Sequence, residues 1–249
     1  MFTDTHCHIY KEYYENIEEI LINAKESGIN RMINNGCDLI SNKEVLNLIN
    51  TYPNMYGALG IHPEKVDTYQ EEDITFIKEN LNDKKVIAIG EIGLDYHYTK
   101  ENKEEQKKLL EDQLLLAQEY NIPVIIHSRE ATEDTINTLK KYKIKGVIHS
   151  FSGSLETAQI YIKMGFLLGI NGVITFKKSK LKEVIKEIPL ENLVLETDSP
   201  YLTPEPFRGT RNEPARVLEI AKFISELKEV SLNDLARITN DNIKRIFDI

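Results

Sequence analysis

Cysteine is scarce in this chain of 249 residues, which contains only Cys7 and Cys37. Two cysteines are too few for a disulfide framework, and these two lack the paired spacing of a zinc ribbon. We therefore expect both thiols to be reduced and structural.

Long apolar runs are also missing. No stretch approaches the ~20 apolar residues that a membrane-spanning helix needs. The start, Met1-Phe2-Thr3-Asp4, lacks the basic segment and apolar core of a secretory signal. We expect a cytoplasmic protein without membrane association, and no segment indicates an obligate protein partner.

Positive charge is in deficit, because 31 Lys and Arg residues face 40 Asp and Glu residues, for a net charge of −9. Such a molecule does not attract polyanions as a basic DNA-coating protein does. A nucleic-acid substrate would need a local basic mouth or bound cations.

Gly/Ser linkers, low-complexity tracts and composition breaks are absent, which predicts a single domain over residues 1–249. The chain instead alternates short Val/Ile/Leu-rich runs with longer amphipathic segments, a pattern typical of βαβ units and a parallel sheet. The predicted strands are 2–8, 31–36, 55–61, 86–92, 123–127, 146–150, 166–171 and 193–198. The predicted helices are 15–27, 41–51, 71–82, 102–120, 130–142, 154–164, 178–187, 212–228 and 231–247.

Eight strand-helix units in about 250 residues favour an α/β fold, a (β/α)8 TIM barrel with extra C-terminal helices. We expect Ser41 and Ser154 to be helix N-caps, and Gly28 and Gly165 to end helices. An open doubly wound sheet is the competing fold, but it usually carries a Gly-rich phosphate turn after its first strand. This chain has His6-Cys7-His8-Ile9-Tyr10 there.

Ionisable residues gather where the predicted strands end. They are His6, His8, His62, Glu91, His127, His149 and Asp198. Barrel enzymes keep their chemistry at this end of the strands, so we expect these side chains to form one site. For any single histidine the alternative is a hydrogen-bonded core residue; His97, several residues into a loop, is interpreted as structural or substrate-proximal.

Alternation along a strand puts His6 and His8 on one face, where two imidazoles can hold one metal ion. The whole set exceeds what one zinc needs, so we predict a binuclear metal centre. His6, His8 and Asp198 would hold one divalent ion and His127 and His149 the other, with Glu91 bridging them. A water between two such ions loses a proton near neutral pH and becomes the nucleophile. Asp198 can accept that proton, and the imidazoles favour Zn, Mn, Fe or Ni.

Further residues are assigned to the surroundings of this centre. Glu196 and Asp4 are expected to orient ligands, since each precedes a ligand by two residues. Arg129, Arg208 and Arg211 are candidates for phosphate binding, with surface salt bridges as the alternative. Lys177, Lys178, Lys180 and Lys182 form either a basic lip or an ordinary solvated face.

The ordered motifs resemble the TatD family of metal-dependent deoxyribonucleases over essentially the whole chain. They are Asp4-Thr5-His6-Cys7-His8, Gly60-Ile61-His62-Pro63, Gly90-Glu91-Ile92-Gly93-Leu94-Asp95-Tyr96, Pro123-Val124-Ile125-Ile126-His127-Ser128-Arg129, His149-Ser150-Phe151-Ser152-Gly153, Glu196-Thr197-Asp198-Ser199-Pro200-Tyr201-Leu202 and Arg208-Gly209-Thr210-Arg211-Asn212-Glu213-Pro214.

The resemblance implies metal ligands at His6, His8, Glu91, His127, His149 and Asp198. It also implies hydrolysis of DNA, as a 3′-to-5′ exonuclease on single-stranded ends, with Mg or Mn as the usual metals. In that reading His62 and Arg129 lie near the scissile phosphate, while Thr210 replaces a lysine that is common in the family.

Two other functions fit the same residues. The first is a metal-dependent hydrolase of a small amide, lactone or ester; many barrel amide hydrolases have a carboxylated lysine where this chain has Glu91, which favours the nuclease. The second is a non-catalytic barrel that binds a partner.

Overall fold

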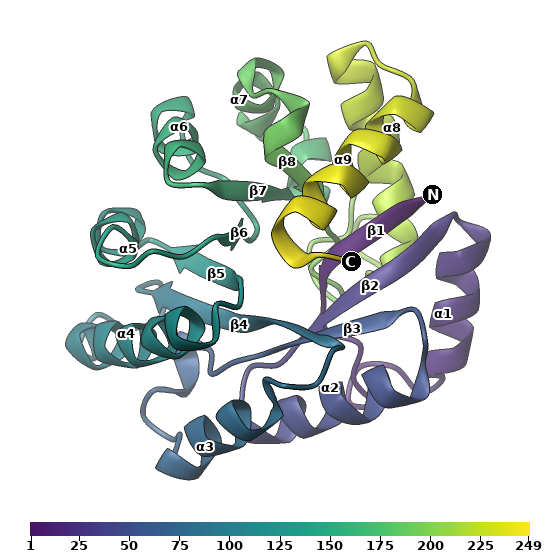
Figure 1. Ribbon diagram of the computed structural model, residues 1–249. Helices are drawn as coiled ribbons and strands as arrows, with labels where there is room; N and C mark the ends of the chain where they lie inside the picture. Colours follow the sequence, from purple (N-terminus) through teal and green to yellow (C-terminus); the bar gives the residue numbers. More distant parts are fainter. The chain divides into compact units, whose positions relative to one another are not determined.

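The computed structural model describes all residues, Met1–Ile249. Eight parallel strands follow one another from β1 to β8 in one sheet, and helices follow the strands along the chain (Figure 1). This is the predicted (β/α)8 barrel fold. The strands are β1 (Phe2–Cys7), β2 (Ile29–Asn35), β3 (Met55–Leu59), β4 (Val86–Asp95), β5 (Val124–Arg129), β6 (Gly146–Ile148), β7 (Phe166–Ile170) and β8 (Leu193–Leu195).

The nine α-helices agree with the predicted ones to within a few residues. They are α1 (Ile17–Glu26), α2 (Leu39–Thr51), α3 (Glu71–Asn80), α4 (Lys103–Tyr120), α5 (Thr132–Leu139), α6 (Leu155–Lys163), α7 (Leu181–Glu187), α8 (Val217–Lys228) and α9 (Leu232–Phe247). No helix combines the length and hydropathy that crossing a bilayer requires. The chain divides into two compact units: unit 1 is Met1–Asn34, Ser150–Lys163 and Leu167–Ile249, and unit 2 is Asn35–His149 and Met164–Phe166.

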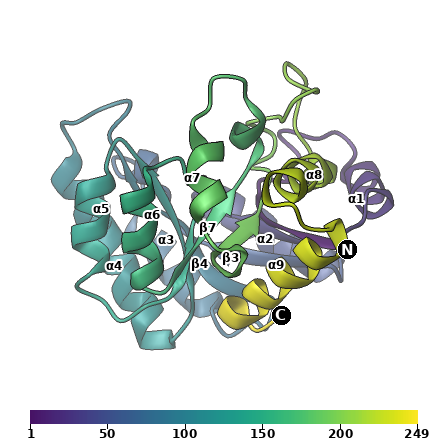
Figure 2. The same cartoon turned by 90° about the horizontal axis from the view of Figure 1, so that it is seen from above.

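Unit 1 contains the first and last strands. Strand β1 pairs with β2, and β7 pairs with β8. Helix α9 packs against β1 and β8, and its fully buried Asn242 amide donates to the carbonyls of Leu190 and Leu193 at 2.8 Å each. Helix α8 lies between α7 and α1 (Figure 2). The two extra C-terminal helices thus cover the strands that carry the first and last predicted ligands.

Unit 2 contains β3 to β6 as neighbouring parallel strands. Every residue of β4 is buried, so this strand forms the interior of the unit. Helix α4 fixes two strand ends with buried amides. Gln113 bonds the backbone N and O of Ile61 (2.8 and 3.1 Å), and Gln106 bonds those of Asp95 (2.9 and 2.8 Å). These side-chain amides satisfy backbone N–H and C=O groups that lack a partner strand where the sheet ends.

Two local predictions need correction. The N-cap of α2 is Asp38, whose carboxylate accepts from the Ser41 amide at 2.9 Å, so Ser41 is the third helical residue of a capping box. Helix α8 begins at Val217 rather than at 212, because Pro214 opens a short 3-10 turn, Pro214–Arg216, before it. Ser154 does bond the amide of Thr157, and Gly28 and Gly165 have positive φ after their helices, as predicted.

Candidate metal centre

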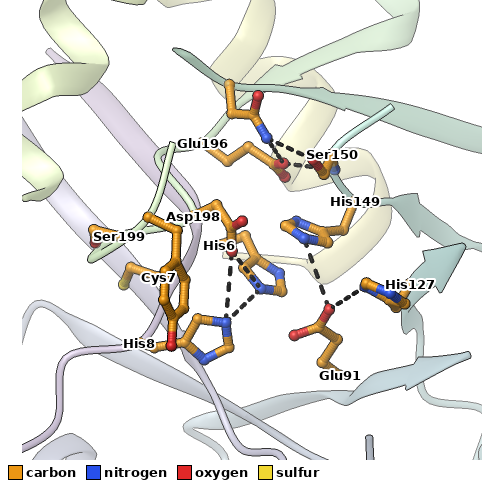
Figure 3. A network of polar contacts seen from close by, with 12 residues as sticks. His6, Cys7, His8, Glu91, His127, His149, Ser150, Glu196, Asp198 and Ser199 are labelled. Atoms are coloured by element: carbon orange, nitrogen blue, oxygen red, sulfur yellow. Dashed lines mark hydrogen bonds and ion pairs between the residues drawn. The ribbon is translucent and has the colours of Figure 1, made fainter. Parts of the chain in front are cut away.

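In unit 1 His6 of β1, His8 just after it and Asp198 after β8 turn toward one another (Figure 3). The Nε2 atoms of His6 and His8 are 3.0 Å apart. The Oδ1 atom of Asp198 lies 3.7 Å from Nε2 of His6 and 3.6 Å from Nε2 of His8. Two imidazoles and a carboxylate therefore present three donor atoms to one point.

Backbone hydrogen bonds hold Asp198 beside β1. Strand β8 ends at Leu195, three residues before the predicted end, and Asp198 has a left-handed φ of 57°. Its amide nonetheless donates to the His6 carbonyl at 2.9 Å, and the His8 amide donates to the Ser199 carbonyl at 2.8 Å. The same bonds that place the histidines thus place the aspartate.

Asp4 and Glu196, the expected ligand-orienting residues, bond the backbone next to ligands. Asp4 accepts from the amides of His6 (3.2 Å) and Thr197 (2.9 Å) and from the Thr197 hydroxyl. Burial raises the pKa of Asp4 to about 8, although these hydrogen bonds oppose it. Glu196 Oε1 accepts from the Ser150 amide at 2.7 Å, directly after His149. Both carboxylates fix the main chain that carries a predicted ligand.

In unit 2 three histidines surround one oxygen of Glu91. Oε1 of Glu91 lies 2.9 Å from Nδ1 of His127, 3.6 Å from Nε2 of His62 and 3.7 Å from Nε2 of His149. Figure 3 shows His127 and His149 directed toward this carboxylate. The structure therefore places His62, assigned above to substrate binding, at the same distance from Glu91 as the predicted ligand His149.

Asp95 is a functional candidate that the sequence reasoning passed over. Its Oδ2 accepts from Nε2 of His127 at 2.8 Å, so His127 is held between two carboxylates. The prediction ended β4 at residue 92, whereas the strand continues to Asp95. Spacing could have revealed it, because Glu91 and Asp95 are four residues apart and share one face of a strand.

Gly93 allows the close approach of β4 and β5 that brings His127 to Asp95. A Cβ atom at Gly93 would lie 1.9 Å from the His127 carbonyl oxygen, far inside van der Waals contact. Glycine is thus required here by packing against the neighbouring backbone.

The two carboxylates set the charge of His127. Burial opposes protonation of the ring, but hydrogen bonds to Asp95 and Glu91 outweigh it and raise the pKa of His127 to about 10. Burial would likewise raise the pKa of Asp95, but hydrogen bonds from His127 and the His97 amide hold it below its ordinary value. Without a metal His127 is therefore a cation between two anions, and a metal ion would take the place of its proton.

Both groups fit a divalent cation. Donor atoms bound ~2.0–2.2 Å from one ion lie roughly 3.0–3.6 Å apart at tetrahedral or octahedral angles. The three separations in unit 1 run from 3.0 to 3.7 Å. The donor atoms of His6, His8 and Asp198 are close enough to one another to hold one metal ion, and so are those of His62, Glu91 and His127. Imidazole with carboxylate is a donor set that Zn and Mn accept.

Cys37 also reaches the unit 2 group, because its Sγ lies 3.9 Å from Oε2 of Glu91.

Each of the three arginines predicted to bind substrate phosphates has its guanidinium over an aromatic ring. The Arg129 guanidinium is 5.3 Å from the Tyr98 ring, Arg208 is 3.7 Å from the Phe176 ring, and Arg211 is 5.1 Å from the Tyr14 ring. His97 bonds Glu130 at 2.6 Å on the surface, which fits its structural interpretation.

Comparison with known proteins agrees with this chemistry. A family model described as TatD related DNase matches residues 3–248. YabD of Bacillus subtilis, an uncharacterized metal-dependent hydrolase, is 44% identical over 254 residues that span 100% of both chains. YcfH of Escherichia coli K12, also an uncharacterized metal-dependent hydrolase, is 33% identical over 99% of this chain and 95% of its own. The crystal structure of YjjV, a TatD homologue from Escherichia coli K12, has a TM-score of 0.93 and 32% identity over 100% of this chain and 98% of its own.

Proposed function

The chain belongs to the TatD-related DNase family of metal-dependent hydrolases, and from this premise we propose that it hydrolyses DNA phosphodiester bonds at a centre of two divalent cations. We further propose that it removes nucleotides from single-stranded 3′ ends. The ions would be Mg, Mn or Zn, and the whole chain would act as one domain in the cytoplasm.

The observation that carries the proposal is the pair of metal-binding groups. His6, His8 and Asp198 form one candidate group in unit 1. Glu91 forms the other in unit 2 with His127 and His149, and His62 lies beside the same Glu91 oxygen. All these residues lie in the carboxyl-terminal halves of strands or within a few residues after them, and parallel strands of a (β/α)8 barrel end on the same side. This supports a centre for two ions, to which Glu91 would contribute its carboxylate.

The side chains have distinct roles in this proposal. Two bound cations would supply a water of lowered pKa and would neutralise charge on the phosphate oxygens. Asp198 is the proton acceptor, because its Oδ1 faces both imidazoles and 14% of its side chain remains exposed. Asp95 holds the His127 ring in place through Nε2. His62, Arg129, Arg208 and Arg211 would contact the substrate phosphates.

A nuclease assay tests the function. Purified protein loaded with Mn, Mg or Zn is incubated with single-stranded DNA labelled at its 5′ end, with and without chelator. We expect a ladder that shortens from the 3′ end, loss of cleavage with chelator, and a drop of at least about a hundredfold in kcat for Asp198→Asn. Asp234→Asn, which changes an exposed carboxylate at the start of α9, serves as the matched control and should cleave normally. Intact DNA with every metal, beside cleavage of a small ester or lactone, would favour the alternative hydrolase.

Metal analysis tests the two-ion centre separately. We expect two ions per chain in the wild type. His6→Ala with His8→Ala should remove one of them, and His127→Ala should weaken the other. A single ion per chain, lost in both variants, would contradict the binuclear assignment.

A further inference from the structure

A row of tyrosine rings leads from the metal ligand His8 to the surface of unit 1. We call it the tyrosine row, and it consists of Tyr10, Tyr13 and Tyr201. The Tyr10 ring centroid is 5.7 Å from that of His8, the Tyr13 centroid 5.8 Å from Tyr10, and the Tyr201 centroid 6.0 Å from Tyr13. Consecutive rings are thus in contact from the ligand outward.

Exposure increases along the row. Tyr10 is buried, with 5% of its surface exposed, Tyr13 is half-buried, and Tyr201 is 52% exposed. Tyr201 is one of the few large apolar side chains left open to solvent. An exposed aromatic ring beside a catalytic group is a surface on which a planar ligand can stack.

The row is fixed in place by polar bonds. The hydroxyls of Tyr13 and Tyr201 are 3.1 Å apart, and the Tyr201 amide donates to the Asp198 carbonyl at 2.8 Å. The Arg211 guanidinium donates to the Tyr13 carbonyl and lies over the Tyr14 ring. Because these bonds already restrict the tyrosine side chains, a stacking ligand costs little additional conformational entropy.

Positive charge adjoins the row. Arg211 contacts it directly through the Tyr13 carbonyl. Arg208, three residues earlier in the chain, has its guanidinium over the ring of Phe176, which Lys177 and Lys178 follow in sequence. These four cationic side chains are exposed, on a chain whose net charge is −9. Rings interleaved with basic side chains are the combination that binds single-stranded nucleic acid without base specificity.

We propose that the tyrosine row is a stacking platform for the nucleobase next to the scissile phosphodiester, with Tyr201 as its outermost ring. The proposal rests on the proposed function and names the part of the substrate that unit 1 recognises. A phosphate held at His6, His8 and Asp198 leaves its attached nucleoside within reach of the rings that begin at His8. Stacking is tolerant of base identity, since every base has a π face, so the platform would favour single-stranded ends over sequence.

Two substitutions of Tyr201 separate stacking from other effects. Tyr201→Phe keeps the ring and loses the hydroxyl, whereas Tyr201→Ala loses both. We expect Tyr201→Ala to raise KM for single-stranded DNA about tenfold, equivalent to about 1.4 kcal/mol, with kcat within about twofold. Tyr201→Phe should stay near the wild type. Tyr142→Ala, which removes a half-buried tyrosine between α5 and β6 of unit 2, is the matched control.

A substrate with an abasic 3′-terminal nucleotide distinguishes base stacking on Tyr201 from a purely structural role of that residue. The wild type should show a raised KM on this substrate, and Tyr201→Ala should show no further increase. Equal losses for Tyr201→Ala on normal and abasic ends would overturn the platform, as would a wild-type KM in Tyr201→Ala.

A binding measurement keeps the platform testable if hydrolysis is absent. The Mn-loaded protein is mixed with an oligonucleotide that carries 2-aminopurine at its 3′ end and phosphorothioate linkages that resist cleavage. Stacking quenches 2-aminopurine fluorescence, so we expect quenching by the wild type and Tyr201→Phe and little by Tyr201→Ala. The expected quenching pattern without cleavage of any DNA would retain the platform and reject the nuclease. Cleavage with equal quenching by all three proteins would retain the nuclease and reject the platform.

Discussion

Asp95→Asn is the most informative single substitution in unit 2. It keeps the shape of the side chain and removes the negative charge that accepts from Nε2 of His127 at 2.8 Å. Asp95 is buried, with 3% of its surface exposed, and its pKa is held low, so the native bond is one between charged groups. Such bonds contribute about 1.5–3 kcal/mol, a factor of roughly 10 to 150. Partners that orient a metal-binding histidine have effects of about 10- to 100-fold on metal affinity or activity.

We therefore expect Asp95→Asn to weaken Mn binding by about 10- to 100-fold while the protein stays folded. In the metal-free protein the pKa of His127 should fall from about 10, since one of the two anions that raise it is gone. Calorimetric titration with Mn measures the first effect, and NMR titration of the His127 ring measures the second.

Asp134→Asn is the matched control, because Asp134 also accepts two hydrogen bonds in unit 2, from the Tyr96 hydroxyl at 2.9 Å and from Lys107 at 3.0 Å. It should leave metal affinity unchanged. If Asp95→Asn binds Mn within twofold of the wild type and His127 titrates as before, the argument that Asp95 positions His127 is refuted.

Three further predictions concern stability. Gly93→Ala should lower the free energy of unfolding by at least about 2 kcal/mol in urea, because the added Cβ collides with the His127 carbonyl; an unchanged midpoint would contradict this packing. In the metal-free protein, the stabilisation from protonated His127 is complete below pH of about 6.5, where the unfolded chain is protonated too, and is lost as the pH rises through about 10. The free energy of unfolding in urea should thus fall over that pH window more for the wild type than for His127→Gln. Parallel pH dependences of the two proteins would refute this prediction. Thr197→Val should cost about 1–3 kcal/mol of unfolding free energy because buried Asp4 loses a hydroxyl donor, with Thr197→Ser as the conservative variant that retains it.

The fold was predictable because each strand and helix has its own hydrophobic period. All eight strands and nine helices occur where the pattern placed them, with ends that differ by a few residues. The meeting of candidate metal-binding side chains was predictable for the same reason: the rings of His6 and His8 lie on one side, as alternation requires. The ends themselves depend on tertiary contacts, so Asp38 rather than Ser41 caps α2.

Apart from Asp95, the missed features depend on contacts in the folded chain that sequence spacing does not encode. The predicted strand ended at residue 92, yet β4 continues through Gly93, where the neighbouring β5 backbone occupies the space that a side chain would need. Asp198 takes a left-handed conformation that a simple strand pattern does not predict. The tyrosine row joins residues 10 and 13 to residue 201, and only the folded chain brings such segments together.

The backbone bonds between β1 and the segment after β8 also bear on the order of assembly. Thr197 follows Asp4 by 193 residues, so the group of His6, His8 and Asp198 cannot close until most of the polypeptide has been synthesised. The contacts of Glu91 with His62 and His127 span no more than 36 residues. During translation the second group can therefore form well before the first, and a chain truncated before residue 198 would lack Asp198 and leave the first group incomplete.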